Sequence, residues 1–539
     1  MPPALAPARI AVIADAHFHD ISGDYGLSQA VALRPLAEVA RNPRAFNETG
    51  FALRYALDEV VAQGIGLVVL LGDYSDDGQM TTLAGLGGVL TEYRVRRGLR
   101  FFAVPGNHDV FADVGRHRGR RFLNAGGGYD LVTSDPDRHD PAAGRVVVWP
   151  GMRCLGAPEA VQRLPDLGFF RREGDLHWET PFGASDAVDA RQFTIRSSDG
   201  ATGRQMMDLS YLVEPEPGLW LLMIDANVFV PFDLAERGGH QDDYADSTDA
   251  GWQAMLRHKP FILPWMQDVA QRAALQGKRL LTFSHYPMLD ACPAARADAV
   301  AVFGAVPMVR RAPGPEVARA VLNTGIKVAF SGHLHQNDTA LYRADGQFVV
   351  NVGVPSLGAF PGCWKTVMVD DQRVTVETIS TGAMPMPDVV RQAYRFEQSL
   401  KDIGAERLIA ADNYGVFLAE HAAHLVVRRH LRREWPAEMV PLVMQSTLAD
   451  LVGETDLAGI TVLTLVQDWY RVQAGGEFGV ALIPPARMQA YRRVARLLLA
   501  TGGKPTAFAR LFRMFEAFLA RLPSDRFAID LATGDVEPF

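Results

Sequence analysis

The 539-residue chain contains only three cysteines, and they form no recognisable pattern. Cys154, Cys292 and Cys363 lie far apart and make no CxxC pair, so neither a thiolate zinc site nor a disulfide framework is expected. This cysteine usage fits a reducing compartment, and we expect a cytoplasmic protein. The N-terminal stretch MPPALAPARIAVIAD has no basic segment before a long apolar core, so no signal peptide is expected.

The chain also lacks an excess of basic charge and lacks long apolar runs. It has 54 Lys and Arg against 62 Asp and Glu, a formal net charge of -8, and so no overall field that would attract long nucleic acid. No run is long enough to span a bilayer, so no membrane association is expected. The hydrophobic fraction of 48% is that of an ordinary folded protein, and the length favours two domains.

Short apolar runs that each end in polar residues recur through the first part of the chain. They are ARIAVIAD (8–15), GLVVLLGD (66–73), LRFFAVPGNHD (99–109), LWLLMIDAN (219–227), KRLLTFSHYP (278–287) and KVAFSGHLH (327–335). Such runs are typical of strands buried on both faces, and amphipathic helix patterns such as residues 51–64 lie between several of them. This alternation predicts an α/β core with its site at the carboxyl ends of the strands.

The later part of the chain changes character. Residues 348–380 are rich in strand patterns, with a hairpin turn expected at 370–372, and helix patterns then run to the end. In the last of these, a 3.6-residue period predicts a packed helix face made of Phe508, Leu511, Phe512, Phe515, Phe518 and Leu519. We therefore expect one domain over 1–384, with insertions at about 112–205 and 230–260, and a helical domain over 385–539.

The polar strand ends carry two aspartates, one asparagine and four histidines. They are Asp15, His17, Asp73, Asn107, His285, His333 and His335. Two pairs are spaced i and i+2, which places both side chains of a pair on the same side of an extended strand. Carboxylates combined with imidazoles suit Mn, Fe or Zn. Two such divalent ions sharing a bridging carboxylate can hold a hydroxide between them and clamp an in-line phosphoryl displacement, so the set predicts phosphate ester hydrolysis.

Five sequence blocks stand in order along the chain: DAH, GDYSDDG, GNHD, SHYP and GHLH. In this the sequence resembles the calcineurin-like metallophosphoesterase superfamily, whose pattern reads D-x-H, GD, GNH-D/E, H and GH-x-H. The resemblance covers roughly residues 8–380. It implies a four-layer α-β-β-α metallophosphoesterase sandwich, here followed by a C-terminal all-helical accessory domain.

The resemblance also implies a role for each site residue. One metal would be bound by Asp15, His17, Asp73 and His335, and the other by Asp73, Asn107, His285 and His333, so that Asp73 bridges them. His108 would not bind metal but would face the scissile phosphate and protonate the leaving oxygen after attack by the bridging hydroxide. Asp109 would either hold the His108 ring or serve as a turn residue that bonds the loop backbone; both readings are open.

We expect small phosphodiesters as the favoured substrates. The family also contains phosphomonoesterases, protein phosphatases and nucleases, so these activities on the same site are alternatives. An alternative of another class is a scaffold that binds a partner through the helical tail, and the same tail could join copies of the chain into a homo-oligomer. Scaffold members of the family tend to lose metal ligands, whereas this sequence retains all seven.

The residues around the blocks leave the choice of substrate open. The arginines of GRHRGRR (115–121) could grip a phosphate or a distal acidic group, or could form a solvated basic loop. In the acidic segment 232–252, His240 could reach the site. Asp76 and Asp77 are expected to bond loop backbone groups rather than metal.

Overall fold

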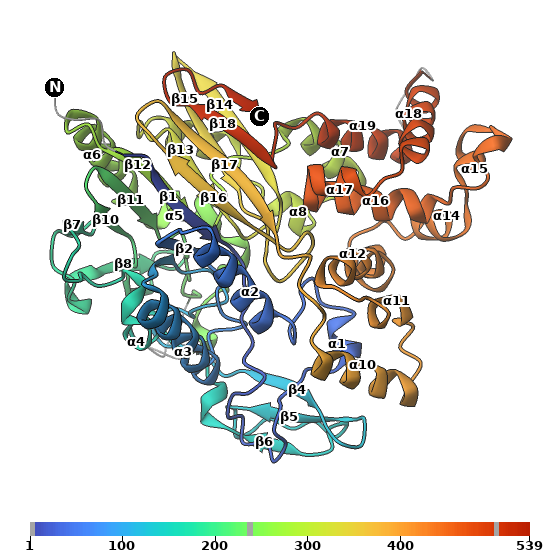
Figure 1. Ribbon diagram of the computed structural model, residues 1–539, viewed down its shortest axis with the longest axis horizontal. Coiled ribbons are helices and arrows are strands. Elements are labelled where there is room, and N and C mark those ends of the chain that lie inside the picture. The colour runs from blue at the N-terminus through green and yellow to red at the C-terminus, as the bar shows by residue number, and fades with distance from the viewer. Residues whose placement is uncertain (1–5, 234–240, 501–505) are drawn as a thin grey trace.

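The computed structural model describes residues 6–233, 241–500 and 506–539. His240, which was predicted to reach the site, lies outside these residues. Two large β-sheets lie face to face in the middle of the molecule, and most of the C-terminal helices gather to one side of them (Figure 1). The sheets contact each other directly, because the Tyr211 hydroxyl on one sheet donates a hydrogen bond to the Ala103 carbonyl on the other at 3.0 Å.

The first sheet has seven strands in the order β19-β18-β17-β16-β1-β2-β3. Their bounds are β1 Ala8–Ile13, β2 Leu67–Leu71, β3 Arg100–Val104, β16 Cys363–Val369, β17 Arg373–Ser380, β18 Arg526–Asp530 and β19 Val536–Pro538. Strands β1, β2 and β3 are parallel, which brings their carboxyl ends to one edge of the sheet. The predicted hairpin joins β16 to β17, and the Asp370 N–H donates to the Arg373 carbonyl at its turn.

The second sheet also has seven strands, in the order β14-β15-β13-β12-β11-β10-β7. Their bounds are β7 His177–Glu179, β10 Tyr211–Glu216, β11 Leu219–Ile224, β12 Arg279–Ser284, β13 Val328–Ser331, β14 Asp338–Ala344 and β15 Gln347–Gly353. Strands β11, β12 and β13 are parallel. All six apolar runs singled out in the sequence are therefore strands, three in each sheet, and every one is almost fully buried.

Helices cover the outer face of each sheet and complete four layers, α-β-β-α. The helices of this part of the chain are α1 Leu36–Val39, α2 Thr49–Ala62, α3 Met80–Arg97, α4 Ala157–Arg163, α5 Gly251–His258, α6 Ile262–Leu275, α7 Pro293–Phe303, α8 Pro307–Arg310 and α9 Pro315–Leu322. Helix α3 packs on β3 of the first sheet, and the Trp364 indole of β16 donates to Glu59 of α2. Helices α6 and α9 pack on the second sheet.

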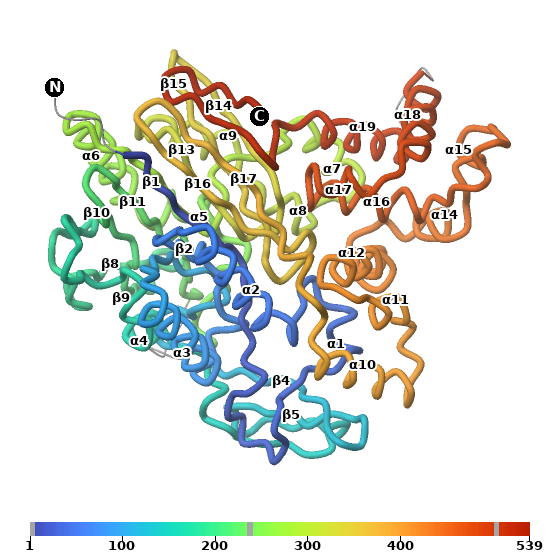
Figure 2. Tube along the Cα trace, in the orientation of Figure 1, coloured from blue at the N-terminus to red at the C-terminus, as the bar shows by residue number. Residues whose placement is uncertain are grey.

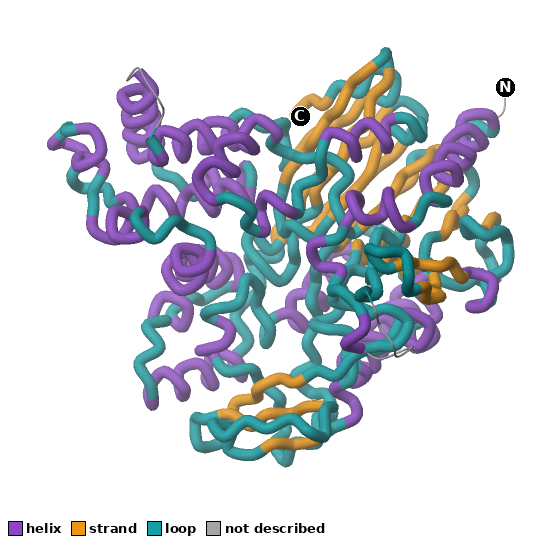
Figure 3. Tube along the Cα trace, turned by 180° about the vertical axis from the view of Figure 1, so that it is seen from behind, coloured by secondary structure: helices purple, strands orange, loops and turns teal. Residues whose placement is uncertain are grey.

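The insertion after β3 builds a small third sheet at the bottom of Figure 1, well separated from the large sheets when seen from behind (Figure 3). It consists of β4 Gly119–Leu123, β5 Tyr129–Thr133 and β6 Val146–Val148, and a two-stranded sheet of β8 Gln192–Arg196 and β9 Gly203–Met207 follows. Strand β7, which lies between them along the chain, extends the second large sheet through β10.

Helices dominate the region after residue 387. They are α10 Asp388–Leu400, α11 Glu406–Ile409, α12 Tyr414–Leu425, α13 Leu431–Arg433, α14 Met439–Gln445, α15 Leu448–Val452, α16 Val462–Gly475, α17 Glu477–Ala481, α18 Pro485–Ala500 and α19 Ala507–Leu519. Tyr394 of α10 and Phe417 of α12 belong to the core of the two sheets. The predicted apolar face of α19 is largely buried and belongs to a second core built around Trp469.

Helix α7 lies in this second core although it comes from the segment between β12 and β13. Phe303 of α7 packs against Trp469, and Asp298 accepts hydrogen bonds from Arg510 and Arg513 of α19 at 2.7 and 2.8 Å. The helical core is thus built from two segments of the chain that are far apart in sequence.

The prediction of helices up to residue 539 is wrong for its last part. Strand β18 pairs with β17 and β19 with β18, so residues 526–538 extend the first sheet. The red C-terminal segment in Figure 2 marks this return to the edge of the sheet, next to β17. Along the segment RFAID burial alternates, with Phe527 and Ile529 buried and their neighbours more exposed, which is the period of a half-buried strand.

Among the described residues, no helix is both long and apolar enough to cross a bilayer.

A buried carboxyl group joins α10 to the core of the two large sheets. The Tyr394 hydroxyl donates to Glu48 Oε1 at 2.7 Å, and the Asn47 side-chain amide donates to the Tyr394 oxygen at 3.1 Å. Burial raises the pKa of Glu48 to about 7, although the bond from Tyr394 opposes the shift. The native state therefore holds a proton on Glu48 under conditions in which the unfolded chain has lost it.

We predict that Glu48→Gln stabilises the protein increasingly as the pH rises. The native state binds the extra proton between the unfolded pKa of 4.5 and the native pKa of about 7, so the wild type loses stability as the pH rises through that window. The full shift corresponds to roughly 3 kcal/mol, and glutamine avoids that cost. Melting temperatures of both proteins from about pH 5 to about pH 8 test this. A difference that does not change with pH would show that Glu48 does not titrate as described.

Candidate metal centre

The carboxyl ends of the parallel strands bring all seven predicted ligands to one place. Asp15 and His17 follow β1, Asp73 follows β2, Asn107 follows β3, His285 follows β12, and His333 and His335 follow β13. The first sheet supplies four of these side chains and the second sheet supplies three, so the site lies across the gap between the sheets.

Left-handed backbone turns aim most of these side chains. Positive φ angles occur at Asp15 (48°), His17 (43°), Asp73 (47°), His333 (66°) and His335 (55°). Such angles are uncommon for residues with a side chain and persist only where surrounding bonds impose them. The Asp15 and His17 N–H groups donate to the Gly72 and Asp73 carbonyls at 3.0 and 2.8 Å. The side chains of each i, i+2 pair converge as expected. The prediction that an extended strand brings them together is wrong, because left-handed turns do so.

Three glycines allow the close packing beneath the site, and each stands in a sequence block. A Cβ added to Gly72 would lie 2.3 Å from His285 Nδ1, one added to Gly106 would lie 2.1 Å from Asp73 Oδ1, and one added to Gly332 would lie 2.4 Å from Asp15 Oδ2. The glycine of GD, of GNH and of GHLH therefore makes room for a functional side chain that comes from another strand end.

The side chains form two adjacent groups, Asp15 with His17 and His335, and Asp73 with His285 and His333. Within each group the candidate ligand atoms lie within 4.8 Å of one another. The Asp73 carboxylate faces both groups, since Oδ2 lies 3.8 Å from His17 Nε2 and Oδ1 lies 3.5 Å from His285 Nε2.

Asn107 completes the second group. Its Oδ1 lies 3.3 Å from His285 Nε2, while its Nδ2 donates to the Thr248 hydroxyl at 3.2 Å. This bond turns the amide oxygen toward the histidines. The acidic segment 232–252 therefore orients a residue of the site through Thr248, a contact that the sequence did not signal.

The donor set fits two divalent cations. Among the described residues, the buried atoms His17 Nδ1 and His333 Nε2 have no hydrogen-bond partner. Burial opposes a charge on His285, but the Asp73 and Asp15 carboxylates outweigh it and raise the pKa of this imidazole to about 9. Carboxylates and neutral imidazoles gathered in a buried site are the ligands that Mn, Fe and Zn prefer, and a bound cation would replace the proton that Asp73 and His285 share.

His108 lies beside this centre and is oriented by Asp77. Its Nδ1 lies 2.9 Å from Asp77 Oδ1, its backbone N–H donates to Asp73 Oδ1 at 2.8 Å, and its ring lies edge-on to the His17 ring with centroids 5.1 Å apart. Arg44 Nη1 lies 3.2 Å from His108 Nε2. Burial and Arg44 lower the pKa of His108 to about 4.

Asp109 does not hold the His108 ring, the first of the two roles that the sequence left open. Asp109 Oδ1 accepts hydrogen bonds from the Ser75 N–H and hydroxyl at 2.9 and 2.8 Å, and Oδ2 accepts from the Gly106 N–H at 2.8 Å. Burial and the Asp73 charge raise the pKa of Asp109 to about 7. Of the two readings left open by the sequence, the turn residue is the one observed, and Asp109 fastens two loops of the site to each other.

The arginines of the first insertion are all engaged in ion pairs, and of the four only Arg121 is largely exposed. Arg118 Nη2 lies 3.2 Å from Asp77 Oδ1, and Arg120 forms ion pairs with Asp77 and Asp76. Arg44 also pairs with Asp76, at 2.9 Å. The two aspartates are buried and bind side chains rather than mainly loop backbone. The remaining two arginines pair elsewhere, Arg116 with Asp246 and Arg121 with Asp140.

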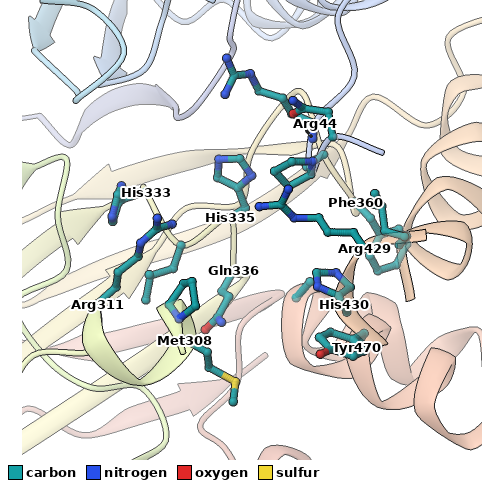
Figure 4. A pocket seen from close by; sticks show the side chains of 18 of the residues that line it. Arg44, Met308, Arg311, His333, His335, Gln336, Phe360, Arg429, His430 and Tyr470 are labelled. Carbon is teal, nitrogen blue, oxygen red and sulfur yellow. Dashed lines mark hydrogen bonds between the residues drawn. The ribbon is translucent and has the colours of Figure 1, made fainter. Parts of the chain in front are cut away.

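A cavity of about 450 Å³ opens in front of the centre (Figure 4). One wall carries His108 and Arg44 together with five of the candidate ligands, His17, Asp73, Asn107, His333 and His335. The opposite wall comes from the helical region and includes Arg429, His430 and Tyr470, which Figure 4 shows facing His335 across the cavity. Helices outside the sandwich thus contribute directly to the space in which a ligand would lie.

Among known proteins, a family model matches the first part of the chain. Residues 8–185 match the family model described as "Calcineurin-like phosphoesterase", which spans the DAH, GDYSDDG and GNHD blocks. No curated protein matches the chain.

Solved structures with a related description are similar only at a low level. A dimetal phosphatase from Danio rerio has 14% sequence identity and a TM-score of 0.38, and the match covers 69% of this chain and 96% of that chain. The calcineurin-like phosphoesterase YfkN from Bacillus subtilis has 11% identity and a TM-score of 0.26, with 73% and 97% covered. Similarity at this level carries no argument about function.

We predict that Gly106→Ala disrupts the metal centre. The new Cβ would collide with the Asp73 carboxylate, which must move away from both groups of ligands. Metal content after loading with Mn, measured by elemental analysis, should fall severalfold, because coordination needs ligand atoms within a few tenths of an ångström. The matched control is Gly88→Ala in α3, where the added Cβ meets no atom within 4 Å. Equal metal content in the two variants would contradict the role given to Gly106.

Proposed function

We propose that the protein hydrolyses phosphate esters at a two-metal site, with small phosphodiesters as favoured substrates; the match of residues 8–185 to the calcineurin-like phosphoesterase model supports this. The observation that carries the proposal is the arrangement of two donor groups on either side of Asp73, with His108 beside them at the cavity. Asp15, His17, Asp73 and His335 would hold one cation, and Asp73, Asn107, His285 and His333 the other.

The bound cations would supply charge neutralisation at the phosphoryl oxygens and an activated water. Side chains of the protein would orient the catalytic groups and transfer the proton. Asp77 accepts the Nδ1 proton of His108 and fixes the ring so that Nε2 faces the cavity, where it can transfer a proton to the leaving alkoxide. A phosphate anion beside His108 favours the protonated ring and so opposes the effect of Arg44.

The shape of the cavity supports a small substrate. Its volume of about 450 Å³ is in the range of small-molecule sites, and it is closed on one side by the helical region. A long nucleic acid needs a continuous basic groove, and the net charge of -8 argues against one.

Phosphomonoesters are the second candidate, and Arg44 is the observation that favours them. Its guanidinium lies at the cavity within 3.2 Å of His108, where it can add charge compensation for a dianionic phosphate group. A scaffold without catalysis is the less favoured alternative, because all seven candidate metal ligands are present. A cytoplasmic location and self-association through the helical region stay predictions.

The reaction is tested with purified protein, metal analysis and two chromogenic esters. Protein loaded with Mn should hydrolyse bis-p-nitrophenyl phosphate faster than p-nitrophenyl phosphate. The reverse ranking would replace the diester preference with a monoesterase. Protein that binds no Mn, Fe or Zn and leaves both esters intact would refute the proposed reaction.

Three substitutions separate metal binding from proton transfer. Asp73→Asn should lose metal and activity together, since a neutral amide cannot serve both groups as a charged bridge. His108→Ala should keep both metals and lose about 10² to 10⁴ in kcat. Asp77→Asn should lose less, about 10- to 100-fold, because the ring stays but its orientation is no longer held. Elemental analysis beside kcat decides the outcome, and loss of metal in the His108 variant would contradict its role.

A further inference from the structure

A π-helical turn, Val426–His430, interrupts the helix that runs from α12 into α13 at the wall of the cavity. Such turns add a residue to the helix, shift the register of the following side chains and occur often at functional sites. Here Arg428 points away and donates to the Ile403 carbonyl at 2.8 Å, whereas Arg429 and His430 line the cavity. The turn therefore presents two consecutive side chains to the space in front of the metal centre.

Arg429 extends into this space without a partner. No hydrogen bond or ion pair joins its guanidinium to any residue in the described part of the chain. The neighbouring carboxylate, Glu434, is already engaged by His430 Nδ1 at 3.0 Å and by the Tyr470 hydroxyl at 3.4 Å. The His430 ring stacks on Tyr470 with centroids 4.3 Å apart, which keeps Glu434 and His430 in place.

A second guanidinium reaches toward the cavity from the opposite wall. Arg311 follows α8 and lines the cavity, and its Nε lies 2.6 Å from Asp249 Oδ1. Figure 4 shows Arg311 and Arg429 on facing walls with His335 above them. Burial and the charge of Arg433 lower the pKa of Arg429, and Arg311 acts in the same direction, while Glu434 opposes this. Two cations held near each other in this way favour binding of an anion between them.

We propose that Arg429 and Arg311 form a subsite for a second anionic group, a carboxylate or a phosphate, on the same substrate molecule. The substrate would then be a phosphate ester whose alcohol part carries an acidic end group. A guanidinium binds either anion through paired N–H donors, which gives selectivity as well as affinity. Phe360 and Met308 line the same cavity and suit an uncharged connecting segment. The inference rests on the proposed hydrolysis, which places the ester phosphate at the metal centre.

The test is a series of p-nitrophenyl phosphodiesters of ω-hydroxy acids of increasing chain length, each compared with its uncharged methyl ester. A parallel series with a terminal phosphonate distinguishes the two anions. At one chain length the Mn-loaded wild type should prefer the acid about tenfold in kcat/KM, mainly through a lower KM. A preference of about tenfold is what one hydrogen bond to a charged group contributes to binding. Arg429→Gln should reduce this preference to about one.

Arg432→Gln is the matched control, since Arg432 lies three residues further on, is exposed and does not line the cavity. It should retain both the activity and the preference. Melting temperatures show whether the substitutions affect folding, and removal of Arg429 is expected to leave the melting temperature unchanged or higher, because no partner is lost and repulsion is relieved.

Calorimetric titration tests binding at the subsite independently of hydrolysis. ω-Carboxyalkylphosphonates, which cannot be hydrolysed, should bind the wild type about tenfold more tightly than their methyl esters, and this difference should disappear in Arg429→Gln. Selective binding without turnover of any ester would retain the subsite and refute the hydrolysis. Equal kcat/KM and equal affinity for acid and methyl ester at every chain length would overturn the subsite, as would an unchanged preference in Arg429→Gln.

Discussion

The carboxylate of Asp73 is the group on which the rest of the site depends. It accepts the backbone N–H of His108, faces His17 on one side and His285 on the other, and rests against Gly106. These contacts come from three different strand ends. The position of the carboxylate is thus set by backbone geometry rather than by flexible side chains, which is how a site holds ligand atoms within the tolerance that metal binding requires.

The sequence predicted the α/β core and the candidate ligands because both leave local signals, whereas the four-layer arrangement was implied by the family resemblance. Strands buried on two faces need continuous apolar residues, and a polar residue just beyond such a run must lie at the sheet edge. That is why Asp15, Asp73 and His285 could be located from their neighbours alone. The left-handed turns at Asp15 and His17 were not visible, because their side chains do not require such angles and the hydrogen bonds that impose them come from the adjacent strand end.

Features that depend on distant partners could not be read in this way. Asp77 and Asp109 stand in two neighbouring loops, and which of them meets His108 depends on how those loops turn in space. Arg44 lies in a loop without any motif. Strand β18 was missed because a five-residue alternation after a long helical stretch is a weak signal, and only the exposed edge of β17 makes it a strand. The extent of the candidate site was therefore underestimated on the side of the helical region.

The place of the helical core in the fold has a mechanical consequence. It is joined to the first sheet at two points, since the chain leaves that sheet after β17 and returns to it at β18, and to the second sheet through α7. The helical core is therefore attached to the two sheets at three points. The candidate ligands come from both sheets, Asp15, Asp73 and Asn107 from one and His285 and His333 from the other. The helical core is thus attached to both sides of the gap in which two metal ions would have to fit.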